Sequence, residues 1–117
     1  MAGKEISSCR YVEALVKRKV HQQQLNERMR GIAAILTPTV PTAAIPIDDV
    51  DQKGSPTRFT RFGNYFTMCG ISIPMGLTDK GLPAGLQILA PSLQEATAIR
   101  IGAAYEAARG PAAIPEI

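Results

Sequence analysis

Two short apolar segments, residues 70–74 and 84–90, constrain what this chain can fold into more than any other feature. In the first segment, apolar side chains alternate with small or polar ones, which is typical of a strand. The second segment is rich in apolar residues and also has the length of a strand. Residues 75–81 between them contain two glycines and predict a turn region. We therefore expect two strands that can pair as a hairpin.

A long helix is expected over residues 7–30, where apolar side chains recur at helical spacing. Ser7 or Ser8 can cap it, because a short hydroxyl side chain accepts a hydrogen bond from an orphan N–H of the first turn. Gly31 is placed to end the helix in a left-handed conformation. The continuous apolar run that follows, residues 32–36, predicts a strand buried on both faces.

Residues 39–56 contain three prolines, a glycine and the acidic residues Asp48, Asp49 and Asp51, and they predict a long loop. Loops of this length are usually functional or disordered, or they belong to a larger protein against which they lie. Residues 57–68 predict a short helix with a phenylalanine side.

A last helix is expected to begin at the capping box formed by Ser92 and Glu95. Its apolar face would carry Ala96, Ile99 and Ala103, and Gly110-Pro111 would end it. The tail, residues 109–117, is expected to be loose.

Helices thus alternate with short apolar strands, so the predicted class is α/β, with α+β as the alternative. We expect one domain over residues 1–117, with a small mixed sheet of about three strands packed with three helices. The chain has no Trp and only three Tyr and three Phe, which predicts an aliphatic core.

No apolar run approaches the length of about 18 residues that a membrane helix needs, and the first residues lack the apolar region of a signal peptide. We therefore expect a cytoplasmic location and no membrane partner. Cys9 and Cys69 lie outside any CxxC motif and predict free thiols, although a disulfide between them stays open.

Positive charge is concentrated near the N-terminus: residues 1–30 hold seven of the 13 Lys and Arg residues, and the chain has a net charge of +3. A basic helix of this kind is compatible with binding nucleic acid or an anionic surface. A solvated helix face is the favoured interpretation, so nucleic acid is not expected as a partner.

The residue types that can carry chemistry are scattered along the chain. His21 is the only histidine and is expected on a polar helix surface, where no nucleophile is linked to it. Cys69 is interpreted as a small buried hydrophobe, and Asn64 as a structural residue that bonds nearby backbone. The acidic residues of the long loop lack the spacing of a calcium loop. We therefore predict no catalytic residue, no metal site and no cofactor.

Several stretches together resemble the C-terminal part of the amidase-signature family, over about residues 7–108. The resemblance rests on the T-P-T end of a strand, on an Asn-bearing helix that leads into "ISVP-x-G", on a "GLPxGLQLIA" strand and on a closing helix that ends in "AYE". Here these stretches read ILTPT (35–39), RFTRFGN (58–64), GISIPMG (70–76), GLPAGLQILA (81–90) and residues 95–106.

The resemblance implies hydrolysis of amide bonds by a Lys, a cis-Ser and a nucleophilic Ser, all of which lie upstream of the part matched. No stretch of this chain corresponds to them, and its serines stand isolated: Ser7, Ser8, Ser55, Ser72 and Ser92. The resemblance therefore implies the C-terminal portion of an amidase-like hydrolase that is inactive alone.

In the family this region contributes one wall of the substrate pocket, which by position places Thr57, Thr60 and Phe66 nearest such a wall. The family commonly has "G-x-P" ahead of its strand, whereas this chain has Thr67-Met68-Cys69, a change expected to alter a turn at the pocket. The faces that would lie against the rest of a larger enzyme are expected to expose an apolar patch.

The alternative function is a non-catalytic binding or scaffold module that self-associates or pairs with a partner. In the leading interpretation the partner is the missing catalytic part, and an amide substrate binds only in its presence.

Overall fold

The computed structural model describes residues 2–51, 54 and 57–112. By internal contacts the chain divides into two units, Met1–Ile32 and Ala33–Ile117, which are described separately below. Whether they form the single domain expected from the sequence stays a prediction.

The first unit consists of a short 3-10 helix, η1 (Ala2–Glu5), and the long helix α1 (Ser8–Arg28). Ser7 is the N-cap, and its side-chain oxygen accepts a hydrogen bond of 3.3 Å from the backbone N–H of Arg10. Beyond the helix Gly31 has a φ of 79°, the left-handed conformation that glycine adopts without steric cost. The predicted helix, its serine cap and the left-handed conformation of Gly31 are therefore confirmed, but the helix ends earlier than expected, at Arg28, and its C-cap is Met29.

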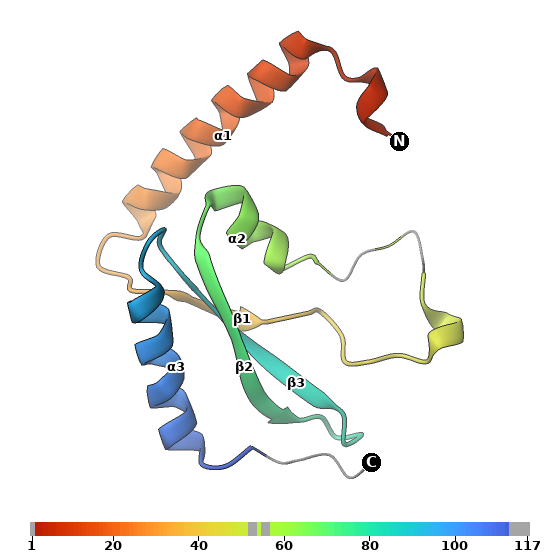
Figure 1. Ribbon diagram of the computed structural model, residues 1–117, viewed down its shortest axis with the longest axis vertical. Coiled ribbons are helices and arrows are strands. Elements are labelled where there is room, and N and C mark those ends of the chain that lie inside the picture. The colour runs from red at the N-terminus through yellow and green to blue at the C-terminus, as the bar shows by residue number, and fades with distance from the viewer. Residues whose placement is uncertain (1, 52–53, 55–56, 113–117) are drawn as a thin grey trace. The chain divides into compact units, whose positions relative to one another are not determined.

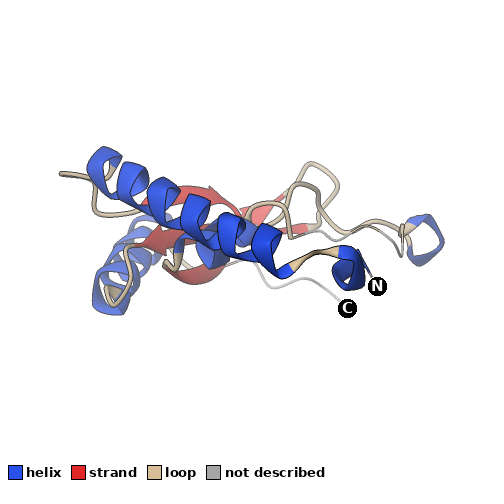
Figure 2. Cartoon of the chain, turned by 90° about the horizontal axis from the view of Figure 1, so that it is seen from above, coloured by secondary structure: helices blue, strands red, loops and turns tan. Residues whose placement is uncertain are grey.

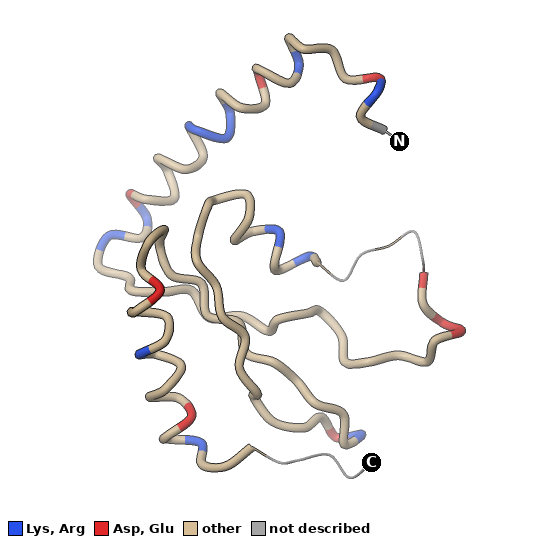
Figure 3. Tube along the Cα trace, viewed as in Figure 1, with Lys and Arg blue, Asp and Glu red and all other residues tan. Residues whose placement is uncertain are grey.

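Most of the apolar stripe of α1 is exposed, and no residue of this helix is buried. Large apolar side chains exposed along it are Tyr11, Val12, Leu15, Val16 and Val20. Basic residues outnumber acidic ones on the same unit, as the blue and red segments of Figure 3 show. The apolar patch expected on the faces that would lie against a larger enzyme is a separate expectation, and it stays a prediction.

The second unit contains a three-stranded sheet with the order β1-β3-β2, formed by β1 (Ile35–Pro38), β2 (Cys69–Leu77) and β3 (Pro83–Ala90) (Figure 1). The predicted hairpin is confirmed as the antiparallel pair β2–β3. Every pairing is antiparallel, so the expectation of a mixed sheet was wrong. The reason is the position of β3, which separates β1 from β2 and runs opposite to both.

Prolines mark the two edges of this sheet. Pro38 ends β1 and Pro74 lies within β2, and both are edge strands, where a missing N–H breaks no ladder. The strand expected over residues 32–36 begins later, at Ile35, and is not buried on both faces, since Leu36 is 55% exposed. As an edge strand, β1 has a neighbour on one side only.

The core lies between the sheet and α3 (Glu95–Arg109). Ile88 and Ala90 of β3 and Ala98 of α3 have no solvent exposure. A Cβ atom at Gly102 would lie 3.0 Å from Ile71 Cδ1, so this glycine allows the helix to approach the strands closely. The core is aliphatic, as expected.

The face that α3 buries differs from the predicted one. Ala98 and Gly102 are buried, whereas Ala96, Ile99 and Ala103 are exposed. Alanine occurs on all sides of this helix, so its apolar pattern does not single out one face.

The predicted capping box was also wrong. The N-cap of α3 is Gln94, with no side-chain cap bond, and Ser92 precedes it in a turn where Leu93 has a φ of 62°. The end of α3 at Gly110, with a φ of 81°, is confirmed.

The long loop holds one turn of 3-10 helix, η2 (Ile47–Asp49), which lies far from the strands (Figure 2). Residues 52–53 and 55–56 of this loop and residues 113–117 of the predicted loose tail lie outside the described residues. The helix expected over residues 57–68 is the shorter α2 (Thr60–Phe66).

Candidate functional site

The face of the sheet opposite α3 is polar at its centre. Side chains alternate along β3, so Gln87 and Leu89 point away from the core residues Ile88 and Ala90. The register places Ser72 opposite Gln87. No strand carries a charged residue, and all three strands are tan in Figure 3.

Glycines lie where helix α2 is close to one end of this face. A Cβ atom at Gly63 of α2 would lie 3.0 Å from Leu89 Cδ2, and one at Gly70 of β2 would lie 2.9 Å from the same atom. Leu89 itself is 2% exposed. A side chain at either glycine would therefore press on the side chain of Leu89.

A depression of about 260 Å³ lies between α2 and the polar face of the sheet. Among the described residues, none of those that line it is charged. They are Thr39, Thr60, Gly63, Asn64, Met68, Gly70, Ile71, Ser72, Gln87 and Leu89.

Two hydrogen bonds organise the floor of this depression. Thr37 Oγ1 donates to Gln87 Oε1 over 3.3 Å, and the hydroxyls of Thr39 and Ser72 are hydrogen-bonded to each other. Gln87 is 6% exposed and is therefore a buried polar group at the centre of the sheet. The first bond joins β1 to β3, and the second joins the residue that follows β1 to β2.

Of the three predicted wall residues, the structure brings Thr60 to the depression. The hydroxyl of Thr57 instead accepts a hydrogen bond of 3.1 Å from Arg61 Nε, within the turn that begins α2. Phe66 packs in an aromatic cluster, with its ring centroid 4.6 Å from that of Phe62. Neither Thr57 nor Phe66 is among the lining residues. Their role at a substrate pocket stays a prediction.

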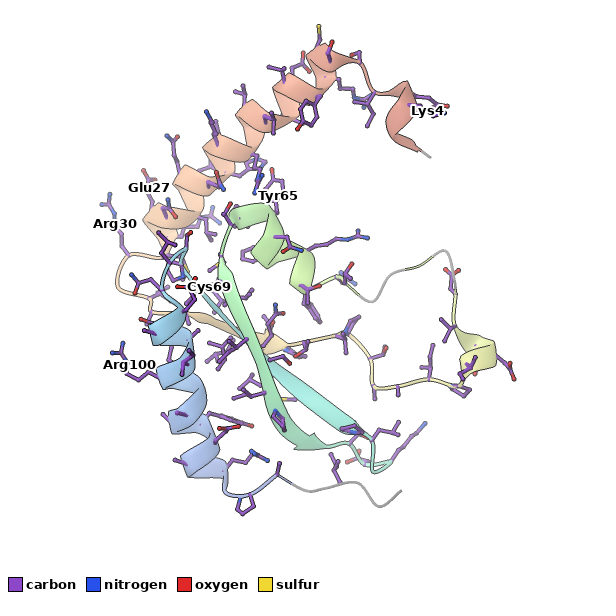
Figure 4. The ribbon with its side chains drawn as sticks, viewed as in Figure 1. Lys4, Glu27, Arg30, Tyr65, Cys69 and Arg100 are labelled. Carbon is purple, nitrogen blue, oxygen red and sulfur yellow. The ribbon has the colours of Figure 1, made fainter. Side chains whose placement is uncertain are left out.

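Asn64, interpreted from sequence as structural, lines the depression beside Thr60. Cys69 is half-buried at the start of β2, and its Sγ lies 3.3 Å from the carbonyl oxygen of Pro91 and 3.6 Å from that of Ala90 (Figure 4). Both cysteines are free thiols, as expected. Arg100 projects from α3 on the side away from the sheet (Figure 4).

Sequence reasoning missed the polar residues of the strands. Gln87 and Ser72 interrupt apolar strand segments, and this interruption was the signal that could have identified them. Thr39 gave no such signal, since its position beside Ser72 depends on the sheet register. In the part of the chain that the structure describes, no group of three His, Cys, Asp or Glu side chains is arranged to hold a metal ion.

No described helix combines the length and the apolar character that crossing a membrane requires. The cytoplasmic location expected from sequence stays a prediction.

Comparison with known proteins identifies relatives. An amidase family profile matches residues 1–99. The A subunit of the glutamyl-tRNA(Gln) amidotransferase of Mycobacterium ulcerans is 41% identical over 106 residues, which cover 86% of this chain and 22% of that protein. The corresponding protein of Mycobacterium leprae is 36% identical over 108 residues and is covered to 21%. This chain thus spans about a fifth of the length of these curated relatives.

Solved structures agree on the fold. The crystal structure of the A subunit of glutamyl-tRNA(Gln) amidotransferase from Thermotoga maritima matches 92% of this chain with a TM-score of 0.76 and 27% identity, over 25% of its own length. Kluyveromyces lactis allophanate hydrolase matches 91% of this chain with a TM-score of 0.80 and 17% identity, over 18% of its own length. The three helices and three strands are therefore a part of the amidase fold, and the chain belongs to the amidase family.

Proposed function

We propose that this chain is the C-terminal portion of an amidase-like hydrolase and that it supplies one wall of an amide-binding pocket without breaking bonds itself. The observation that carries the proposal is the uncharged polar depression between α2 and the sheet. The chain that holds it spans about a fifth of the length of its curated relatives. Hydrolysis would need the Lys and the two Ser residues of a catalytic part, which the sequence resemblance places upstream.

The surroundings of the depression support this proposal. On the other flank of α2, a second depression of about 260 Å³ is lined by Ile35, Thr37, Arg58, Phe59, Phe62 and Leu89. Two unfilled spaces on one face of a sheet are unusual for a closely packed interior. They are the kind of surface that a further layer of protein would cover.

The test is amide hydrolysis by complementation. This chain, a separately produced segment of the Mycobacterium ulcerans protein that precedes its matched region, and a mixture of the two would each be given simple primary carboxamides. Water would add to the carbonyl carbon as the C–N bond breaks, so released ammonia reports the reaction. We expect ammonia only from the mixture. Ammonia release by this chain alone would contradict the assignment of a non-catalytic part.

The complementation assay is repeated with two matched variants of this chain, the core variant Ile88→Ala and the surface variant Ile99→Ala. Ile88 is fully buried and Ile99 is 59% exposed. Activity that survives Ile99→Ala and is lost with Ile88→Ala would show that complementation needs the folded second unit.

The exposed apolar stripe of α1 favours a second candidate, a non-catalytic module that self-associates or pairs with a partner. Helices of this length usually depend on packing of an apolar face rather than on intrinsic propensity. Self-association of the chain, measured by sedimentation, together with no activity in the mixture would favour this candidate.

A further inference from the structure

Helix α1 exposes a face on which apolar side chains surround a lysine. Val12, Leu15 and Val16 are all exposed on it. Lys19 follows Leu15 by four residues and Val16 by three, and residues at these spacings are neighbours on a helix surface. Among the described residues, the side chain of Lys19 has no hydrogen-bond or ion-pair partner. This face therefore suits a partner that supplies both apolar side chains and a carboxylate.

The long loop exposes a segment of that composition at η2. Ile47 and Val50 are exposed there, and so are the carboxylates of Asp48 and Asp49. The backbone N–H of Val50 donates to the carbonyl oxygen of Ile47 over 3.2 Å. Because side chains three residues apart lie on the same side of a 3-10 turn, Ile47 and Val50 form one apolar edge of the loop.

The face of α1 and the loop at η2 match in spacing and in charge. Ile47 and Val50 are about 6 Å apart along a 3-10 turn, and Val12 and Val16 are about 6 Å apart along an α-helix. Residues 1–30 hold seven Lys and Arg against three Glu, whereas residues 39–51 hold three Asp and no Lys or Arg (Figure 3). Charges that are separated in this way attract between copies of one chain.

We propose that the exposed face of α1 in one copy of this chain binds the loop at η2 in a second copy. The apolar edge of the loop packs against the valines of the helix, and Lys19 pairs with the carboxylates of Asp48 and Asp49. Each contact is small, so the association is weak and depends on salt. This inference rests on the second candidate function, self-association, and names the surfaces that produce it.

The first test is sedimentation velocity of the full chain over a range of concentrations, at low and at high salt. We expect association that rises with concentration and falls as salt screens the charges. A chain that stays monomeric at every concentration would overturn the inference. Association that salt leaves unchanged would overturn it as well.

Two charge reversals on α1 form a matched pair. Lys17 and Lys19 are both exposed, and two residues of helix place them on opposite sides. Lys19→Glu should weaken association at least about fivefold, the order of one surface ion pair. Lys17→Glu changes the net charge equally and should weaken association far less. Equal effects of the two variants would mean that net charge governs association, which overturns the inference.

Two apolar side chains of equal exposure test the loop. Ile47 is 86% exposed at η2, and Leu93 is 85% exposed in the turn before α3. Ile47→Ser should weaken association, because it removes the apolar edge of the loop, whereas Leu93→Ser should leave association unchanged. An equal or larger effect of Leu93→Ser would overturn the inference.

Mixing charge-reversed chains shows whether the contact joins two copies. The double variant Asp48→Lys/Asp49→Lys and the variant Lys19→Glu should each associate only weakly by themselves. An equimolar mixture of the two should associate as the parent chain does, because every contact between unlike copies again joins opposite charges. Circular dichroism checks that both variants are folded. A mixture of folded variants that does not associate would overturn the inference.

These readouts are independent of amide hydrolysis. Ammonia release in the complementation assay decides the proposed function whether or not the chain self-associates. Self-association that none of the substitutions alters would keep the second candidate function and overturn only this inference. If Lys19→Glu instead weakens binding of the added amidase segment and leaves self-association unchanged, the catalytic part covers this face, and the inference is overturned.

Discussion

The hydroxyl groups of Thr39 and Ser72, 33 positions apart in the chain, are hydrogen-bonded to each other over Gly85 of the central strand. A Cβ atom built on Gly85 would lie 2.7 Å from Thr39 Oγ1 and 3.0 Å from Ser72 Oγ. The hydrogen-bonded pair, and the polar face to which it belongs, therefore require a residue without a side chain at position 85.

Gly85→Ala should lower the free energy of unfolding by about 1–3 kcal/mol, the usual cost of overpacking. Urea denaturation of the chain measures this change. In the double variant with Thr39→Ala, part of the loss should be recovered because Oγ1 is gone. Gly85→Ala with unchanged stability would show that the two hydroxyls move aside easily.

Ile88→Ala should be far more costly than Ile99→Ala. Ile88 is fully buried against α3, and truncating such a side chain costs about 2–5 kcal/mol, whereas surface substitutions usually stay within about 0.5 kcal/mol. Thermal and urea unfolding of the two variants check the difference. Equal effects would mean that Ile88 is not in the core.

The two serines that precede helices should behave differently. Ser7→Ala removes the acceptor of the Arg10 N–H and should cost about 1 kcal/mol, the typical value of an N-cap. Ser92→Ala should change stability little, because Ser92 does not cap α3. Circular dichroism at increasing temperature compares them. A larger loss for Ser92→Ala would restore the predicted capping box.

Thr67→Gly should stabilise the chain. Thr67 ends α2 with a φ of 57°, a left-handed conformation that costs a β-branched residue about 1–2 kcal/mol, while glycine adopts it freely. This residue also belongs to the segment in which the sequence departs from the family's "G-x-P". We expect a gain of about 1 kcal/mol in urea unfolding, and a smaller one for Thr67→Ala. A loss of stability with glycine would mean that the threonine side chain compensates for its strain.

The two thiols should react with Ellman's reagent in two phases. Cys9 is exposed on α1, whereas Cys69 is half-buried with its Sγ near two backbone carbonyl oxygens. The fast phase should disappear in Cys9→Ser, and the slow phase should speed up in urea. A single fast phase for both thiols would contradict the position of Cys69.

Features that depend on neighbouring residues could be predicted from the sequence. The β2–β3 hairpin follows from alternation and turn glycines, and a serine cap follows from hydroxyls before an apolar stripe, although the sequence left Ser7 and Ser8 open. The buried face of α3 could not be predicted, because alanines on all sides leave the choice to Ile71 and Ile88 of the sheet.

The depression could not be predicted from the sequence either. It depends on Thr39, Ser72 and Gln87 meeting through strand register, and that register is fixed by packing across the whole sheet. Thr60, which lines the depression, was predicted to lie near a pocket wall from the family resemblance. Local sequence patterns alone would not have identified it.

The order β1-β3-β2 also bears on how the sheet assembles in time. Strand β2 meets β3 across a short turn, so this pairing closes a small loop, whereas Ile35 must find Leu89 across more than fifty residues of chain. Closing the longer loop costs more entropy and comes later when local contacts lead folding. As an edge strand, β1 is expected to detach before the hairpin and α3 do. Its amide protons should then exchange with solvent earlier than those of β2, and Thr37 would withdraw from Gln87 in the same event.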